Sequence, residues 1–204
     1  ATAQLYWSSD RNGKPGLYTQ AIKAGGPVSN VPLTLESGCA VTVEDVEPWV
    51  TPDGTVLFFS SPRITTLSSI DRVVLRQTAS SELDLYTATV QGSGWTTLTN
   101  NLGNLVNYPN AEDSGPVIIP TGAVNPSNGS VATEPFILFD SKRDSGKHQI
   151  FSSALFKSTL SPAPLASPIN QGTSGTHDYN PAYAYLSATA QLYWSSDRNG
   201  KPGL

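Results

Sequence analysis

Cysteine, methionine, charge and long apolar runs are all scarce in this 204-residue sequence. Cys39 is the single cysteine, so no intrachain disulfide can form, and we expect a small buried hydrophobic residue there. Charged residues make up only 14 % and the net charge is −4, which disfavours nucleic acid, because phosphates require clustered Lys and Arg. No apolar run approaches the roughly 18 residues that span a bilayer. We therefore expect neither a nucleic-acid nor a membrane partner.

Sustained helical spacing is also missing, and strand signals recur in its place. The 17 glycines and 16 prolines suit short strands joined by turns. The sequence does not determine the cellular compartment, although a secreted or periplasmic location is slightly favoured. The predicted strands are rich in β-branched or aromatic residues, or alternate with a period of two: Gln4–Ser8, Leu17–Ile22, Val56–Ser60, Leu83–Val90, Phe136–Phe139 and Gln149–Phe156.

These strands belong to an internal repeat whose clearest element ends in arginine. The four arginine strands are Leu5–Arg11, Leu57–Arg63, Ile137–Arg143 and Leu192–Arg198. Further strands follow at Leu17–Thr19, Leu85–Thr87 and Ile150–Ser152, and later segments recur at Pro32–Thr34, Thr97–Thr99 and Ala163–Leu165. A segment ahead of the arginine strand recurs at Asp45–Trp49, Val106–Pro109 and Asp178–Pro181. Four segments in a fixed order predict a four-stranded antiparallel meander, which is the blade of a β-propeller.

The repeat resembles a known family. Its pattern, P-x-x-spDG-x-lyFsSdR followed by dLYta and LT, is similar to the repeats of TolB-type six-bladed β-propellers. The best instance runs from Val46 to Arg63, and the resemblance covers nearly the whole chain outside two predicted insertions, Ile64–Ser81 and Pro116–Thr133. It implies a fold but leaves function open, because such repeats occur both in binding modules and beside hydrolases.

One segment of the sequence occurs twice. Residues Ala188–Leu204 repeat Ala1–Leu17 letter for letter, as after a very recent duplication, in an engineered chain, or in a tandem array cut one strand into its next repeat. We expect one partial propeller domain over 1–204, with blades at about 1–37 (joined by 178–204), 40–101 and 104–168. Three blades are too few to close a ring, so the sequence predicts half of a six-bladed ring that closes by homodimerisation or strand swapping.

Arginine supplies the first group of candidate binding residues. Arg11, Arg63, Arg143 and Arg198 each follow a predicted strand. They could form a ring of cations for anionic ligands. The simpler interpretation is that each arginine braces its own blade, because equivalent residues in every repeat usually serve the repeat.

The starts of the first strands supply the second group. In a propeller they line one mouth of the central channel, where acidic residues and a histidine could bind a metal, move protons or join neighbouring blades. We expect no cofactor, while a channel-bound metal ion stays open. His148 is predicted to be an exposed strand residue, and Trp95 in a turn is a candidate for stacking on sugars. The channel-mouth residues are Glu44, Asp45, Glu47, Asn107, His177, Asp178 and Asn180.

Catalytic signatures are missing from the sequence. It contains no Gly-x-Ser-x-Gly elbow, no His-Glu-x-x-His and no phosphate-cradling glycine loop. The favoured function is a non-enzymatic binding or interaction scaffold that self-associates. The alternatives are a carbohydrate-active or hydrolase-associated propeller using Glu44, Asp45 and Asp178, and a lectin-like module for a glycan or other small molecule.

Overall fold

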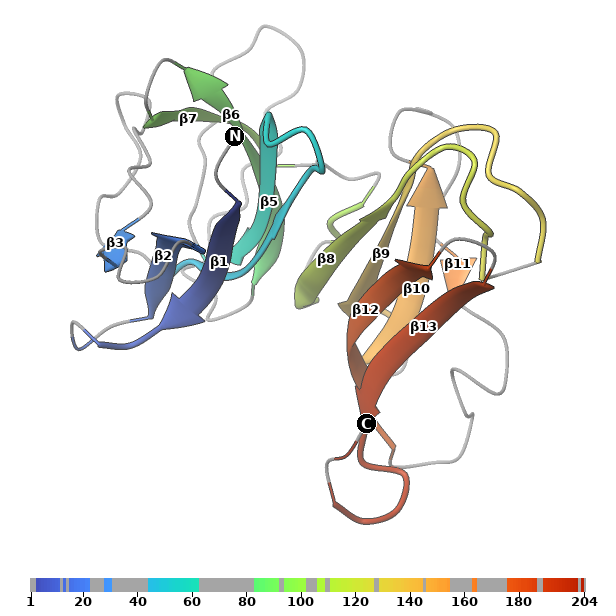
Figure 1. Cartoon of the computed structure of the whole chain (residues 1–204). Helices are drawn as coiled ribbons and strands as arrows, with labels where there is room; N and C mark the ends of the chain where they lie inside the picture. The colour runs from blue at the N-terminus through green and yellow to red at the C-terminus, as the bar shows by residue number, and fades with distance from the viewer. Residues whose placement is uncertain are drawn as a thin grey trace, which may run out of the picture. The chain divides into compact units, whose positions relative to one another are not determined.

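The chain is built from antiparallel β-strands in small sheets, as a computed structural model shows (Figure 1). The chain divides into two compact units, Ala1–Leu102 and Gly103–Leu204, and each is described here by itself. None of the helices in the described part of the chain is long and apolar enough to cross a membrane. The structure describes residues 3–11, 13, 15–22, 28–30, 44–62, 83–91, 94–101, 106–108, 111–126, 129–144, 146–154, 163–164, 176–186, 189–201 and 203.

The N-terminal unit contains a three-stranded and a four-stranded sheet. The first has the order β1 (Gln4–Ser9), β2 (Gly16–Ala21), β3 (Val28–Asn30). The second has the order β4 (Val46–Val50), β5 (Val56–Ser61), β6 (Asp84–Gln91), β7 (Gly94–Asn101). Both are meanders, in which each strand pairs with the one that follows it in the chain.

The C-terminal unit contains a four-stranded and a two-stranded sheet. The first is a meander of β8 (Asp113–Ile119), β9 (Phe136–Ser141), β10 (Gln149–Ala154) and β11 (Ala163–Pro164). The second pairs β12 (Asp178–Leu186) with β13 (Thr189–Ser196). The repeated segment therefore forms β1 in one unit and β13 in the other.

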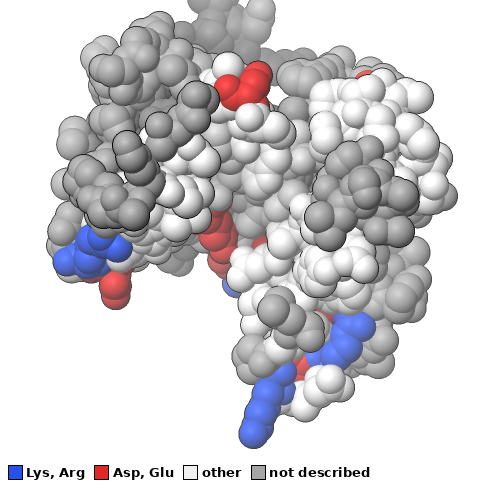
Figure 2. All heavy atoms as spheres, in the orientation of Figure 1, with Lys and Arg blue, Asp and Glu red and all other residues white. Residues whose placement is uncertain are grey.

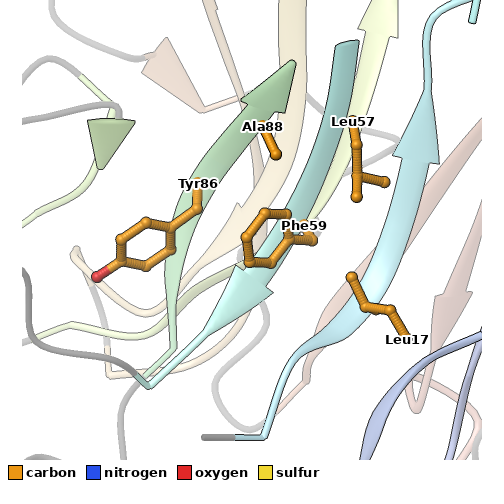
Figure 3. Packing of buried hydrophobic residues seen from close by; sticks show 5 residues of the cluster. All are labelled: Leu17, Leu57, Phe59, Tyr86 and Ala88. Atoms are coloured by element: carbon orange, nitrogen blue, oxygen red, sulfur yellow. The ribbon is translucent and has the colours of Figure 1, made fainter. Parts of the chain in front are cut away.

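Apolar side chains from neighbouring sheets pack together in the N-terminal unit. Leu17 of β2 joins four buried residues of β5 and β6, and the rings of Phe59 and Tyr86 stack with centroids 5.9 Å apart (Figure 3). In the C-terminal unit every residue of β9 is buried, and Phe139 stacks on Phe151 of β10 at 6.0 Å. These aromatic positions correspond in the repeat, so the same stacking recurs in both units. The N-terminal cluster comprises Leu17, Leu57, Phe59, Tyr86 and Ala88.

Each first strand, β4, β8 and β12, carries the same irregularity. Its pairing register shifts near the third residue of an Asp-x-x-Pro sequence, and that residue has a positive φ: 55° at Glu47, 62° at Gly115 and 50° at Asn180. An extra residue on one strand of an antiparallel pair is a β-bulge, which bends the strand and redirects its amide groups. We call this feature the first-strand bulge.

The structure confirms the predicted meander and corrects one of its strands. The sheets of β4–β7 and β8–β11 follow the predicted order, and β12 covers the segment expected to open a blade. The first strand of the third repeat is β8, however, and not the segment at Val106–Pro109. The predicted insertion at Pro116–Thr133 is therefore wrong for Pro116–Ile119, which belong to β8. Among the described residues that follow, Val124 and Val131 form an isolated antiparallel bridge.

A closed propeller is not detected among the residues that the structure describes. The other predicted insertion, Ile64–Ser81, lies outside the described residues, as do Cys39 and the segment Pro32–Thr34.

Candidate functional site

The most elaborate polar arrangement in the C-terminal unit surrounds Arg143. Its Nη2 donates to Oδ1 of Asp113 at 2.6 Å and also to the carbonyl of Val106, while Nε donates to Oγ of Ser141 at 2.9 Å. The guanidinium carbon lies 5.0 Å from the ring centroids of both Phe139 and Phe151. The cation is thus held between a first-strand carboxylate and two strand aromatics. We call this arrangement the arginine clamp.

Asp113 is fully buried, and its other carboxylate oxygen accepts the amide of Tyr108 at 2.5 Å. Burial raises the pKa of Asp113, while Arg143 and the hydrogen bonds from Ser141 and Tyr108 act in the opposite direction. Asp113 begins β8, and Arg143 lies two residues after the end of β9. Their ion pair therefore fixes the first strand of this sheet to the arginine strand.

Arg198 repeats the arginine clamp at the end of β13. Its Nη2 donates to Oδ1 of Asp178 at 2.5 Å, its Nε donates to Oγ of Ser196 at 2.8 Å, and its guanidinium lies 5.5 Å from the ring of Trp194. The indole N–H of Trp194 also donates to Asp178 at 3.2 Å. Asp178 is only 2 % exposed, so the ion pair is largely withdrawn from water.

Arg11, the duplicate of Arg198, has a different environment. Its backbone and Nε both donate to Oγ of Ser9 at 3.3 Å, and its guanidinium lies 4.5 Å from the ring of Tyr18 and 5.2 Å from that of Trp7. Within the part of the chain that the structure describes, Arg11 has no carboxylate partner. In the described ranges, the sheet of β1, β2 and β3 contains no first strand of the kind that supplies this carboxylate elsewhere.

The first-strand bulge joins neighbouring sheets within each unit. The amide of Glu47 donates to Oγ of Ser8 on β1 at 2.6 Å, and the amide of Asn180 donates to Oδ2 of Asp140 on β9 at 3.0 Å. Ser8 and Asp140 hold the same position in their arginine strands. The positive φ turns the amide away from its own ladder and toward the adjacent sheet, so the bulge acts as a connector. The side chain of Glu47 also accepts a hydrogen bond from Ser60 at 2.9 Å.

A buried carboxylate and a histidine lie beside the second connector. Asp140, 1 % exposed, accepts the hydroxyl of Ser114 at 2.9 Å and lies 2.5 Å from Nδ1 of His148. The opposite ring nitrogen of His148 is 3.8 Å from a carboxylate oxygen of Glu112, which also pairs with Lys142. A carboxylate on Nδ1 fixes the orientation of an imidazole. His148 is thereby positioned between two carboxylates.

His148, which immediately precedes β10, also connects that strand to the start of β12. Its amide donates to Nδ1 of His177 at 3.3 Å, and its carbonyl accepts the amide of Asp178 at 2.9 Å. The rings of the two histidines are 5.7 Å apart, and the ring of Tyr179 lies 6.1 Å from His148. In the described ranges, no three His, Cys, Asp or Glu side chains form a group that could hold a metal ion. The hydrogen bonds of His148 and Asp140 to the first residues of β12 make the cluster a polar junction between two sheets.

The predicted site residues divide between the two units. In the N-terminal unit, Glu44 is exposed and precedes β4, whereas Asp45 is 9 % exposed. The prediction that Trp95 lies in a turn is wrong, because Trp95 lies on β7 opposite Val90; only its backbone is described. Arg63 lies outside the described residues.

In the C-terminal unit, three predicted residues are brought together. His177, Asp178 and Asn180 meet the junction around Asp140, as the sequence suggested for the start of a first strand. Asn107 is buried, but it lies in a short turn before β8 and not on a first strand. The prediction that His148 is an exposed strand residue is wrong, since its side chain is only 17 % exposed.

Sequence reasoning missed Asp113, Asp140 and Glu112. The signal for Asp113 was present, because Asp-x-x-Pro occurs at Asp45, Asp113 and Asp178. Aligning the third repeat on Pro109 placed its first strand too early and hid the motif. Asp140 stands where the other arginine strands have a serine. The sequence does not show which neighbouring sheet this position faces, so the contacts of Asp140 could not be predicted.

Comparison with known proteins leaves the function to be argued from these contacts. No protein-family model matches the sequence, and no curated protein matches it significantly. Charge offers little further guidance: in Figure 2 most of the described surface on the visible face is neither basic nor acidic, and the charged side chains gather at a few places.

Proposed function

We propose that this chain is a non-enzymatic interaction scaffold, a partial propeller of the TolB-like type that functions after assembly with a second copy of itself. Two such chains would supply the blades of a six-bladed ring. The proposal rests on how the polar residues are used and on which strands each sheet lacks.

The observation that carries the proposal is the repeated use of polar residues as connectors. Asp113 and Asp178 are buried in arginine clamps, and the amides of Glu47 and Asn180 bind the neighbouring sheet. A buried carboxylate in a close ion pair with arginine is bound by its partner and is withdrawn from contact with a substrate. Residues committed in this way support a scaffold.

These contacts weigh against the hydrolase alternative. Glycoside hydrolysis needs two carboxyl groups on either side of the scissile bond, both able to reach the sugar. Of the three candidates, Asp178 is 2 % exposed and bound to Arg198 and Trp194, and Asp45 is 9 % exposed. Glu44 is exposed, but one carboxylate does not make such a pair.

Two sheets with fewer described strands support the proposed self-association. Two described sheets have four strands each, whereas the sheet of β1, β2 and β3 has three and the sheet of β12 and β13 has two. Edge strands with unpaired backbone groups tend to pair with other chains. Among the described residues, the first of these sheets contains no first strand and the second contains one, so the two would complement each other.

Size-exclusion chromatography with light scattering tests this function on the full chain. We expect a dimer at micromolar concentration that dissociates on dilution. A chain that stays monomeric up to the highest soluble concentration would rule out the proposed assembly.

A further inference from the structure

Arg11 occupies an arginine clamp from which one component is missing. Arg143 has a first-strand carboxylate and two aromatic rings, and Arg198 has a first-strand carboxylate and Trp194. Arg11 has the two rings, Trp7 and Tyr18, and no carboxylate among the described residues. We propose that β12 of a second copy pairs with β1, an inference that rests on the proposed function. This pairing would place Asp178 of the second copy against Arg11 of the first.

The register of this joint follows from the duplicated sequence. In the sheet of β12 and β13, Asp178 is opposite Ser196, Ala182 is opposite Tyr193 and Tyr183 is opposite Leu192. The corresponding residues of β1 are Ser9, Tyr6 and Leu5, each 187 positions earlier. Because β1 has the same sequence as β13, it offers β12 the same side chains and the same ladder. The new pair would place Asp178 beside Arg11 as it now lies beside Arg198.

Among the described strands, β1 is paired along one edge only. β1 is the edge strand of its sheet and pairs with β2 along its whole length. Half of the Leu5 side chain is exposed, at 52 %. In both four-stranded sheets the strand equivalent to β1 lies between a first strand and a third strand. The added β12 would therefore complete the order that the other sheets already show.

The copy that leaves its partner is β13 and not β1. Ser8 of β1 accepts the amide of Glu47, which ties β1 to the neighbouring sheet of its own unit. β2 contributes Leu17 to the apolar cluster of that unit, and Tyr6 of β1 packs against the same cluster. Exchange would thus keep the N-terminal unit intact and release β13 from β12.

The partner is a second copy for a geometric reason. A ring closed within one chain would contain three blades, whereas propellers contain four to eight. Pairing between two chains generates two equivalent joints, in which each copy gives β12 and receives β12. That is the closed twofold arrangement that is commonest among oligomers.

The two arginines provide a test in which matched variants shift association in opposite directions. Arg198→Gln removes the ion pair with Asp178 that holds β12 to β13 of the same chain, and it leaves the proposed pair between Arg11 and Asp178 of the other chain intact. Arg11→Gln removes the pair between chains and leaves the pair within the chain intact. Since a charged hydrogen bond is worth about one decade in an equilibrium constant and each dimer has two equivalent joints, we expect the dimerisation constant to rise on the order of a hundredfold in Arg198→Gln and to fall similarly in Arg11→Gln.

Disulfide trapping tests the register directly. Two differently tagged full-length copies, both carrying Cys39→Ser, are mixed: one carries Leu5→Cys and the other Tyr183→Cys. Directly opposite residues on antiparallel strands have Cα atoms about 4.5–5.5 Å apart, which suits a disulfide. Gln4→Cys replaces Leu5→Cys in the matched control, because neighbouring residues of a strand point to opposite faces.

We expect a mixed disulfide from the Leu5→Cys pair and little from the Gln4→Cys control. A dimer, shown by light scattering, that gives no mixed disulfide and does not respond to the two arginine variants would overturn this joint but leave the proposed self-association standing. A strictly monomeric chain would overturn both.

Discussion

Single residues in this protein act mainly by joining strands that are distant in the sequence. Arg143 shows this most clearly, because it contacts a first strand, its own strand end and two aromatic rings. Its side chain is 6 % exposed and that of Asp113 is fully buried. Removing one member of such a pair leaves the other buried without compensation, at a cost of about 3–5 kcal/mol.

We therefore predict that Arg143→Gln lowers the free energy of unfolding by about 3–5 kcal/mol at neutral pH. Burial raises the pKa of Asp113 and Arg143 opposes that rise, so the pKa should be higher still in the variant. A raised folded-state pKa means that protonation favours folding, and the deficit should shrink as the pH falls toward that pKa. Urea unfolding at several pH values measures this, with the exposed Lys201→Gln as a control. An unchanged deficit at all pH values would contradict it.

Asp53 illustrates the opposite shift in an exposed turn. The hydroxyl of Thr51 donates to its Oδ1 at 2.6 Å, and the hydroxyl and amide of Thr55 donate to the same atom at 2.8 and 3.1 Å. These bonds, that from Thr51 first, lower the pKa of Asp53 below its ordinary 3.8. The stabilisation is present above the unfolded-state pKa and is lost as the pH falls through the folded-state pKa.

NMR titration of the Asp53 carboxyl group should give a midpoint below 3.8. We predict that Thr51→Val raises this midpoint more than Thr55→Val does, because the bond from Thr51 contributes most to the shift. Equal midpoints in all three proteins would show that the threonines do not stabilise the carboxylate.

At the scale of elements, the first-strand bulge is the shared device. It recurs in β4, β8 and β12 with a positive φ each time, although the residue is Glu, Gly or Asn. Left-handed backbone costs most non-glycine residues of order 1–2 kcal/mol. The connecting hydrogen bonds made by Glu47 and Asn180 indicate what maintains the bulge in their sheets.

Gly115→Ala should be the more damaging of two matched glycine substitutions. A Cβ at Gly115 would lie 2.8 Å from Oδ2 of Asp140, whereas a Cβ at Gly122 meets nothing within 4 Å; both residues have positive φ. Both variants share the backbone cost, and only Gly115→Ala adds the clash. We expect an extra loss of about 1–3 kcal/mol for Gly115→Ala in thermal or urea unfolding. Equal losses of stability in the two variants would show that the side chain of Asp140 moves aside at little cost.

How far sequence predicted these elements depended on the strength of each local signal. Aromatic and alternating strands such as β5 and β9 were found within a residue or two, and the start of β12 was placed at the correct residue. The start of β8 was missed, because the bulge accepts three residue types and Pro109 offered a false alignment. The site was only partly predictable. His177 and Asp178 could be placed at a strand start, but their use in joining sheets depends on Asp140 and His148 across a sheet boundary.

At the scale of the whole molecule, the duplicated segment gains a structural meaning. One copy, β1, lies on a sheet in which no first strand is described, and the other, β13, lies on a sheet that has one. In the proposed assembly the two copies would mark the two sides of a single blade. After exchange, β1 of one chain would lie between its own β2 and β12 of the other chain.

Native mass spectrometry of an equimolar mixture of unlabelled and ¹⁵N-labelled full-length chain tests the central claim most directly. The account predicts homodimers together with a mixed dimer of intermediate mass, which forms as the chains exchange. Spectra that contain only the two monomer masses, at concentrations where the protein is soluble and folded, would contradict it.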